Sequence, residues 1–215
     1  MVASDTTQQY KKTLLKAFKG CEKIKSGSYD AVCYYKFPFS EKVRRITGHC
    51  TFSKVPSDKV LGARVELSVT RRDGSVTRKL HDGRYEVVID PEEHPSARVS
   101  DLHQDRRPHY IAGNASSRLL FEPLLPVLRF AKKNKKTFQH LIKNRATHIQ
   151  QLPDDFVEGR PCQVYEVRCK DSQEIKHEVW TFFIDQAHNI PIKYVHKEVY
   201  WAHRNTQRQP LATSR

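Results

Sequence analysis

Histidine and cysteine are the residue types of this chain that could bind a metal ion, exchange electrons or act as nucleophiles. The 11 histidines are never closer than His103 and His109, which are six positions apart. A zinc-binding H-E-x-x-H helix and a C-x-x-C site both need much closer pairs. The five cysteines, at positions 21, 33, 50, 162 and 169, contain no such pair, and their odd number leaves at least one thiol free in a monomer. We therefore predict no local metal or redox motif.

The eight glycines exclude three further kinds of enzyme site. They lie at positions 20, 27, 48, 62, 74, 83, 113 and 159, and no two are two, four or five positions apart. This spacing is incompatible with the G-x-G of a dinucleotide site, with a G-x-S-x-G elbow and with a phosphate-binding P-loop. A site assembled from residues distant in the sequence stays open. Because no local motif supports one, we expect a non-catalytic protein with no catalytic residue, cofactor or metal ion.

Positive charge is the strongest compositional feature. Lys and Arg total 38 against 24 Asp and Glu, which gives a formal net charge of +14 and favours attraction to polyanions or acidic membranes. The candidate contacts to an anionic surface are Lys12, Lys16, Lys19, Lys23, Lys132, Lys133, Lys135 and Lys136. A solvated helix face and a hydrated loop would explain the same residues without any function.

The first segment of the chain has the hydrophobic periodicity of a helix. Between Gln8 and Lys25, apolar residues recur at steps of three or four, at Tyr10, Leu14, Phe18, Cys21 and Ile24. This pattern predicts an amphipathic helix that Gly27 ends. The first four of the lysines above recur at the same steps but about 200° around the helix, so they oppose the apolar face.

Strand-period runs follow to about Ser100. Alternation predicts strands over residues 29–37, 43–55, 63–69, 75–80, 85–89 and 97–102. Asp73-Gly74 marks the turn before the fourth of these strands, and Asp82-Gly83 the turn before the fifth. If Glu41 and Lys42 form a two-residue loop, residues whose numbers sum to 83 face each other across the first hairpin. Cys33 then faces Cys50, and the two thiols can form a disulfide if the protein is exported.

An apolar block at residues 115–145 interrupts the strands. It contains Leu119-Leu120-Phe121 and the run 124–128, and Pro123 and Pro126 are tolerable there only at a kink or in a first helical turn. We predict two or three short helices, with more apolar surface than one exposed helix needs. Strand character then resumes over residues 147–152, 163–169, 178–184 and 191–201. Turn residues such as Asp154-Asp155 separate these strands. This order indicates an α+β protein in which a one-sided sheet encloses helices.

Length and terminal composition favour one domain. A chain of 215 residues can bury roughly 70% of the surface of its unfolded form. We assign residues 1–203 to a single domain and residues 204–215 to a polar tail. No apolar run approaches the ~18 residues of a membrane span, and residues 1–9 lack the apolar stretch of a signal peptide. We expect a soluble monomer, and the compartment stays open.

Three segments resemble motifs of one known family. They are residues 24–31 (IKSGSYDA), where the first helix yields to a strand, residues 81–91 (HDGRYEVVIDP), and Phe183-Ile184-Asp185 followed by residues 190–194 (IPIKY). Together with the order of elements over about residues 10–201, they resemble the LolA/LolB-like bacterial lipoprotein carriers. That group has an N-terminal helix, a strongly curved antiparallel sheet that forms a half-barrel, and short helices on the concave face. Related domains also precede thioredoxin-like modules in exported redox proteins.

The resemblance implies non-covalent binding of a lipid, a lipoprotein acyl chain or another apolar ligand in the hollow of the sheet, in the periplasm or otherwise outside the cytoplasm. We choose the candidate ligand-binding residues because they are apolar and because alternation along each strand predicts that they share one face. On the sheet face they are Tyr35, Phe37, Phe52, Val65, Leu67, Tyr85, Val87 and Ile89. In the apolar block they are Leu120, Phe121, Leu124, Leu125 and Leu128. A filled core with no cavity would use the same residues.

Two other functional classes stay open. The net charge suits a domain that binds anionic surfaces or nucleic acid, although nucleic acid is the less favoured partner because no module with aromatic stacking positions is recognisable. An enzyme with a dispersed site would place a histidine or carboxylate with a strongly shifted pKa in a cleft. A lipid that co-purifies with the protein would favour the carrier, whereas salt-sensitive binding to nucleic acid would favour the basic domain.

Overall fold

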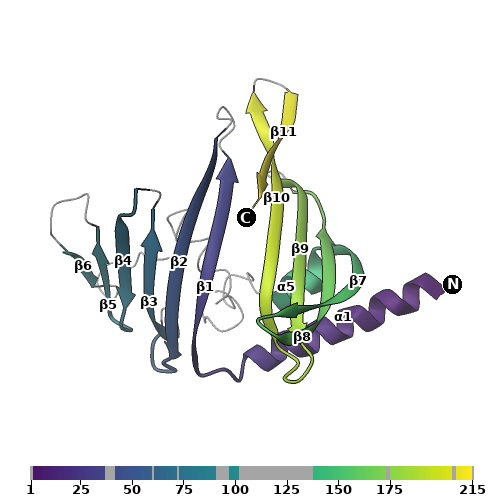
Figure 1. The fold of residues 1–215 in the computed structure, drawn as a ribbon, viewed down its shortest axis with the longest axis horizontal. Helices are drawn as coiled ribbons and strands as arrows, with labels where there is room; N and C mark the ends of the chain where they lie inside the picture. Colours follow the sequence, from purple (N-terminus) through teal and green to yellow (C-terminus); the bar gives the residue numbers. More distant parts are fainter. Residues whose placement is uncertain are drawn as a thin grey trace. The chain divides into compact units, whose positions relative to one another are not determined.

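The architecture is that of a computed structural model (Figure 1). It describes residues 2–36, 42–59, 61–71, 73–90, 97–101, 138–172, 175–204 and 207–214. The chain forms two compact units, which we describe separately: residues 24–35 with 43–135, and residues 1–23 with 36–42 and 136–215. No helix within the described ranges is long and apolar enough to cross a membrane.

The first unit is built on a six-stranded sheet in the order β1-β2-β3-β4-β5-β6, so each strand pairs with its neighbours in sequence. The strands are β1 (Ser26–Lys36), β2 (Val43–Lys54), β3 (Ala63–Thr70), β4 (Val76–His81), β5 (Tyr85–Ile89) and β6 (Ala97–Asp101). Gly83, between β4 and β5, has a φ of 107°, which only glycine adopts without strain. The turn predicted at Asp82-Gly83 is therefore present.

The first hairpin has a different register from the predicted one. The backbone N–H of Lys54 donates to the carbonyl of Lys25 at 2.7 Å, and Nδ1 of His49 lies 2.7 Å from Oδ1 of Asp30. In both contacts the residue numbers sum to 79, not to the predicted 83. Because the shift is an even number of residues, the two apolar faces still coincide, as predicted. Glu41, half of the predicted loop, lies outside the described residues.

The register makes the predicted Cys33–Cys50 disulfide wrong. Cys50 lies beside Tyr29, with which it shares a side-chain hydrogen bond. Cys33 is four residues further along β1 than Tyr29, a distance of roughly 13 Å at ~3.3 Å per residue. A disulfide needs Cα atoms within about 7 Å. Both cysteines are accordingly free thiols, buried on the apolar face of the sheet.

The second unit contains a five-stranded antiparallel sheet in the order β11-β10-β9-β8-β7. Its strands are β7 (Ala146–Val157), β8 (Arg160–Cys169), β9 (Ile175–Asp185), β10 (Pro191–Arg204) and β11 (Gln207–Ser214). The β7–β8 turn is formed by Glu158 and Gly159, whose φ values are 51° and 77°, as a two-residue hairpin turn requires. We predicted a turn at Asp154-Asp155, but these residues lie inside β7, beside a register shift. β11 lies in the segment assigned to a polar tail.

Two helices accompany this sheet (Figure 1), α1 (Val2–Cys21) and α5 (Phe138–Asn144). Both contact β7, and α1 also contacts α5 and β10. The ring of Phe18 lies 5.2 Å from that of Phe138 and 5.0 Å from that of Phe182. Phe138 also stacks edge-on against Trp180 at 5.3 Å. The face of the second sheet that the helices cover is therefore filled with aromatic side chains.

The predicted α+β class, with an N-terminal helix and antiparallel strands, is confirmed. Each strand predicted on either side of the apolar block has a counterpart, although the described strands pair into two sheets. Most of the block, residues 115–137, lies outside the described residues, and its last part forms α5.

Candidate ligand-binding site

One face of the six-stranded sheet brings together three of the predicted ligand-binding residues. Phe52 pairs with Val65 across β2 and β3, and Cys50 pairs with Leu67, so all four side chains lie on one face. Val65 and Leu67 are buried, with 3% and 0% of their surface exposed, and Phe52 is half-buried. We call this the buried face. That Phe52, Val65 and Leu67 contact a ligand stays a prediction.

Tyr85, Val87 and Ile89 do not belong to the buried face, so that part of the prediction is wrong. Val87 pairs with Leu80, which pairs with Glu66, and Glu66 lies between the buried residues of β3. All three predicted residues therefore lie on the opposite face, where Tyr85 is 37% and Ile89 is 40% exposed. Apolarity alone assigned them inward, whereas the register of the β4–β5 hairpin turns them outward.

The remaining predicted ligand residues are not described. Phe37 and the five block residues lie outside the described ranges, as does the side chain of Tyr35 on β1. The block residues are Leu120, Phe121, Leu124, Leu125 and Leu128. The pocket expected between them and the sheet stays a prediction.

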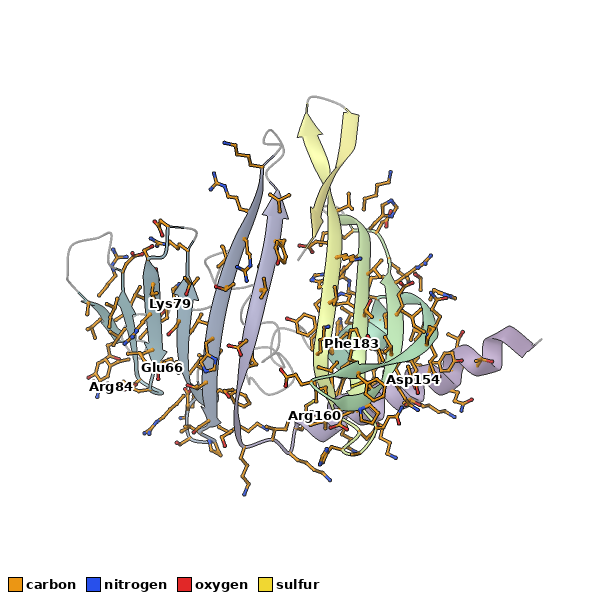
Figure 2. All side chains as sticks on the ribbon, viewed as in Figure 1. Glu66, Lys79, Arg84, Asp154, Arg160 and Phe183 are labelled. Carbon is orange, nitrogen blue, oxygen red and sulfur yellow. The ribbon has the colours of Figure 1, made fainter. Side chains whose placement is uncertain are left out.

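The buried face carries four ionisable side chains that the sequence analysis did not select. Asp58, Lys79, His81 and Glu86 are each 5% exposed or less. Lys79 pairs with Leu67, His81 with Val65, and Glu86 with His81. Figure 2 labels Lys79 on β4 and Glu66 on β3, which lie on opposite faces of the sheet by this register.

A signal for these residues exists in the sequence. In the run Val76–His81 the apolar residues occupy one set of alternate positions, and Lys79 and His81 occupy the other. If the apolar residues of this alternating strand are assumed to be buried, Lys79 and His81 are predicted to face solvent. Counting residues across the Asp73-Gly74 turn, which pairs Thr70 with Val76, turns that set inward instead.

Asp58 organises the loop between β2 and β3. Its Oδ2 accepts hydrogen bonds from the backbone N–H groups of Leu61 at 3.2 Å and Gly62 at 2.9 Å. The same oxygen lies 3.0 Å from Nε2 of His81. Two amide donors favour the ionised carboxylate, which can only accept, so His81 donates from Nε2.

Glu86 and Lys79 have opposite responses to burial. Burial raises the pKa of the Glu86 carboxyl to about 7, and the positive charge of Lys79 opposes this shift only in part. Burial also lowers the pKa of the Lys79 ammonium, against the negative charges of Glu86 and Asp90. At neutral pH the Glu86 carboxyl can therefore donate a hydrogen bond as well as accept one.

A second buried charged cluster lies in the second unit, on the face that the helices cover. Glu178 is paired with Arg145, and Nε1 of Trp180 donates to its Oε1 at 2.8 Å. Burial raises the pKa of Glu178, but the hydrogen bonds from His196 and Trp180 and the charge of Arg145 outweigh it, so the pKa is lowered. The ring of His196 stacks on that of Trp180 at 3.6 Å. Glu178 thus has the partners that a structural buried carboxylate needs.

Cys50 and Cys169 show no sign of nucleophilic activation. Burial raises the pKa of Cys50 to about 11, and burial together with the charge of Glu178 raises that of Cys169 to about 12. A nucleophilic cysteine needs a lowered pKa. Within the described part of the chain, no three His, Cys, Asp or Glu side chains converge as metal ligands.

Comparisons with protein-family models and with curated proteins find no match. Solved structures do match the fold. LprF from Mycobacterium bovis aligns with a TM-score of 0.54 at 8% identity, over 96% of this chain and 92% of LprF. The Mycobacterium tuberculosis lipoprotein LppX aligns with a TM-score of 0.52 at 10% identity, over 89% of this chain and 87% of LppX. The chain therefore shares the fold of LprF and LppX.

The first helix of the chain has the predicted polarity. Leu14 and Phe18 are 0% and 1% exposed, and the lysines of the opposite face are exposed. These four, Lys12, Lys16, Lys19 and Lys23, form what we call the lysine stripe. The other predicted anionic-surface contacts, Lys132, Lys133, Lys135 and Lys136, lie outside the described residues.

Proposed function

We propose that this chain is a non-catalytic carrier that binds an acyl chain or a similar apolar ligand against the buried face of its six-stranded sheet. The contrast between the two sheets carries the proposal. Phe18 and Phe182, in the second unit, are among the largest fully buried side chains of the described residues, whereas in the first unit the corresponding side chains are Leu67, His81 and Glu86. A buried apolar face that carries a few polar groups is typical of a ligand-binding pocket.

The fold supports the same proposal by analogy. LppX, which shares it, is a lipoprotein by name. Because a fold hosts many functions, this likeness raises the expectation of lipid handling and does not replace the argument from the buried face. We accordingly propose that the protein acts outside the cytoplasm.

The lysine stripe supports a membrane-facing role. Three exposed ammonium groups on one side of α1, and that of Lys23 just after its end, suit the phosphate groups of an acidic membrane. Such phosphates attract basic residues within about one Debye length. We propose that this side of α1 approaches the donor or acceptor membrane while the ligand is held against the sheet. Nucleic acid is the alternative polyanion, and the liposome experiment in the Discussion uses it as a competitor.

Two measurements test the carrier proposal. Native mass spectrometry of the purified full chain should show a co-purifying lipid, and a fluorescent fatty acid should bind the delipidated protein. Leu67→Trp should then block binding with little change in the melting temperature, because the larger ring would occupy the space that the ligand otherwise fills. The matched control is Val167→Trp in the second sheet, where overpacking should cost about 1–3 kcal/mol.

The opposite results in these measurements would contradict the carrier proposal. If no lipid co-purifies, no fatty acid binds, and Leu67→Trp destabilises the chain as much as Val167→Trp, then the buried face is filled core and the carrier proposal is wrong.

A further inference from the structure

Two polar atoms on the buried face have no hydrogen-bond partner among the described residues. They are Nδ1 of His81 and Oε1 of Glu86. Each residue is 2% exposed, and the two are direct cross-strand partners on β4 and β5. Direct partners place their Cβ atoms about 5 Å apart on the same face, so the two atoms belong to one locality.

The hydrogen-bonding character of His81 follows from Asp58. Because Nε2 donates to the Asp58 carboxylate at 3.0 Å, a neutral His81 ring has its lone pair at Nδ1. Asp58 is itself held by two backbone N–H groups, so it fixes the orientation of the ring. In that neutral form, Nδ1 is a pre-oriented acceptor.

Glu86 supplies a complementary group. Its carboxyl is buried, and burial favours the protonated form, which both donates and accepts. Lys79, on the same face of β4, adds a positive charge to this locality. Proteins satisfy nearly all buried polar groups, so two adjacent exceptions on a proposed ligand wall indicate a ligand contact.

We propose that His81 and Glu86 form a polar subsite that binds a neutral hydroxyl or amide group of the lipid, next to its acyl chain. A hydroxyl can donate to Nδ1 of His81 and pair with the Glu86 carboxyl at the same time. This inference rests on the proposed carrier function and specifies the chemistry of the cargo.

The test compares two probes that share one acyl chain. 1-Oleoylglycerol carries two hydroxyls beside its ester, and methyl oleate carries none. Each probe displaces a fluorescent fatty acid from the delipidated full chain. We expect the parent protein to bind 1-oleoylglycerol on the order of tenfold more tightly, as one or two additional buried hydrogen bonds would produce.

Substitutions test whether His81 and Glu86 cause the preference for 1-oleoylglycerol. Glu86→Leu and His81→Phe should each abolish most of the tenfold difference and leave the affinity for methyl oleate within about twofold of the parent value. Glu66→Gln, on the opposite face of the sheet, should leave the preference unchanged. The ¹⁵N resonance of His81 Nδ1, assigned with His81→Phe, should shift on addition of 1-oleoylglycerol and not of methyl oleate.

The outcomes separate this inference from the carrier function. Equal binding of both probes by the parent protein, with an unmoved Nδ1 resonance, overturns the polar subsite and leaves the carrier proposal intact. Binding of neither probe overturns both. The probe comparison in the parent protein decides the question even if a variant fails to fold.

Discussion

His81 and Asp58 form a hydrogen-bonded pair, 3.0 Å from Nε2 to Oδ2, in which neither side chain is exposed to solvent. The pair joins β4 to the loop after β2, across 23 positions of sequence. Removing one member of a buried hydrogen-bonded pair leaves the other unsatisfied, and that loss is larger than the net contribution of the hydrogen bond.

Asp58→Ala should therefore lower the free energy of unfolding by about 3–4 kcal/mol, since three donors lose their acceptor. Urea denaturation followed by circular dichroism measures the change. Asp30→Ala is the control, because Asp30 and His49 form an exposed pair in which the carboxylate is 84% exposed. Its effect should stay within about 0.5 kcal/mol. Equal losses in the two variants would contradict the structural role of Asp58.

Glu86 should make stability depend on pH. Burial raises its folded-state pKa to about 7 from an ordinary value of 4.5, so between these values the folded state binds more protons than the unfolded state. Stability from this group is therefore fully present below about pH 4.5 and falls as the pH rises to about 7.

Glu86→Gln should remove that fall. Relative to the parent protein, the variant should gain on the order of 1–3 kcal/mol between pH 5 and pH 8. Urea denaturation at the two pH values gives the difference, with Glu66→Gln as the exposed control. If the parent and Glu86→Gln curves run parallel over this range, the Glu86 carboxyl is not perturbed in the folded state.

The aromatic core of the second unit should tolerate truncation poorly. Phe138 contacts the rings of Phe18, Trp180 and Phe182, and only 3% of its surface is exposed. Phe138→Ala should cost about 3–5 kcal/mol through lost contacts and a cavity. Phe156→Ala, at a position that is 69% exposed, should change stability by about 0.5 kcal/mol or less. A small loss at Phe138 would mean that this face is loosely packed.

The thiols should be unreactive in the folded protein. All five cysteines are buried and free, and burial raises the pKa of Cys50 to about 11. A thiol-specific chromogenic reagent should titrate about five groups in denaturant and react only slowly without it. Non-reducing peptide maps should contain no Cys33–Cys50 disulfide. Finding that disulfide would contradict the β1–β2 register.

The lysine stripe should mediate salt-sensitive binding to acidic membranes. Replacing Lys12, Lys16, Lys19 and Lys23 by Gln should abolish most co-sedimentation with phosphatidylglycerol liposomes at low salt, because the attraction is screened and non-directional. The matched control replaces Lys59, Lys143, Lys170 and Lys197, which are exposed and carry the same total charge.

Equal loss in both variants would assign the binding to net charge and not to α1. Single-stranded DNA that displaces the protein from liposomes at equimolar phosphate would favour the nucleic-acid alternative.

The sequence by itself determined the order and type of the elements. The period of three to four predicted α1, the period of two predicted the strands on either side of the apolar block, and Asp82-Gly83 predicted the β4–β5 turn. These features are local: each follows from residues within about ten positions of one another, and backbone geometry converts them directly into structure.

Only the tertiary structure decided which face of each strand is buried. Tyr85 and Glu86 are neighbours, and the pairing of Glu86 with His81 turns the carboxylate inward and the tyrosine outward. In the same way, the β1–β2 register separates Cys33 from Cys50. Successive residues of a strand point to opposite faces of the sheet. The number of residues in a turn therefore decides which face of the following strand is buried, and composition does not specify that number.

The candidate site was the least predictable part for the same reason. Phe52, Val65 and Leu67 could be placed on one face from alternation, because their apolarity agrees with their burial. Asp58 and His81 could not be associated, since their contact depends on how the β2–β3 loop packs beside β4 and not on any local pattern. Because these ionisable residues are buried on the face proposed to bind the ligand, their polar atoms become candidate ligand contacts.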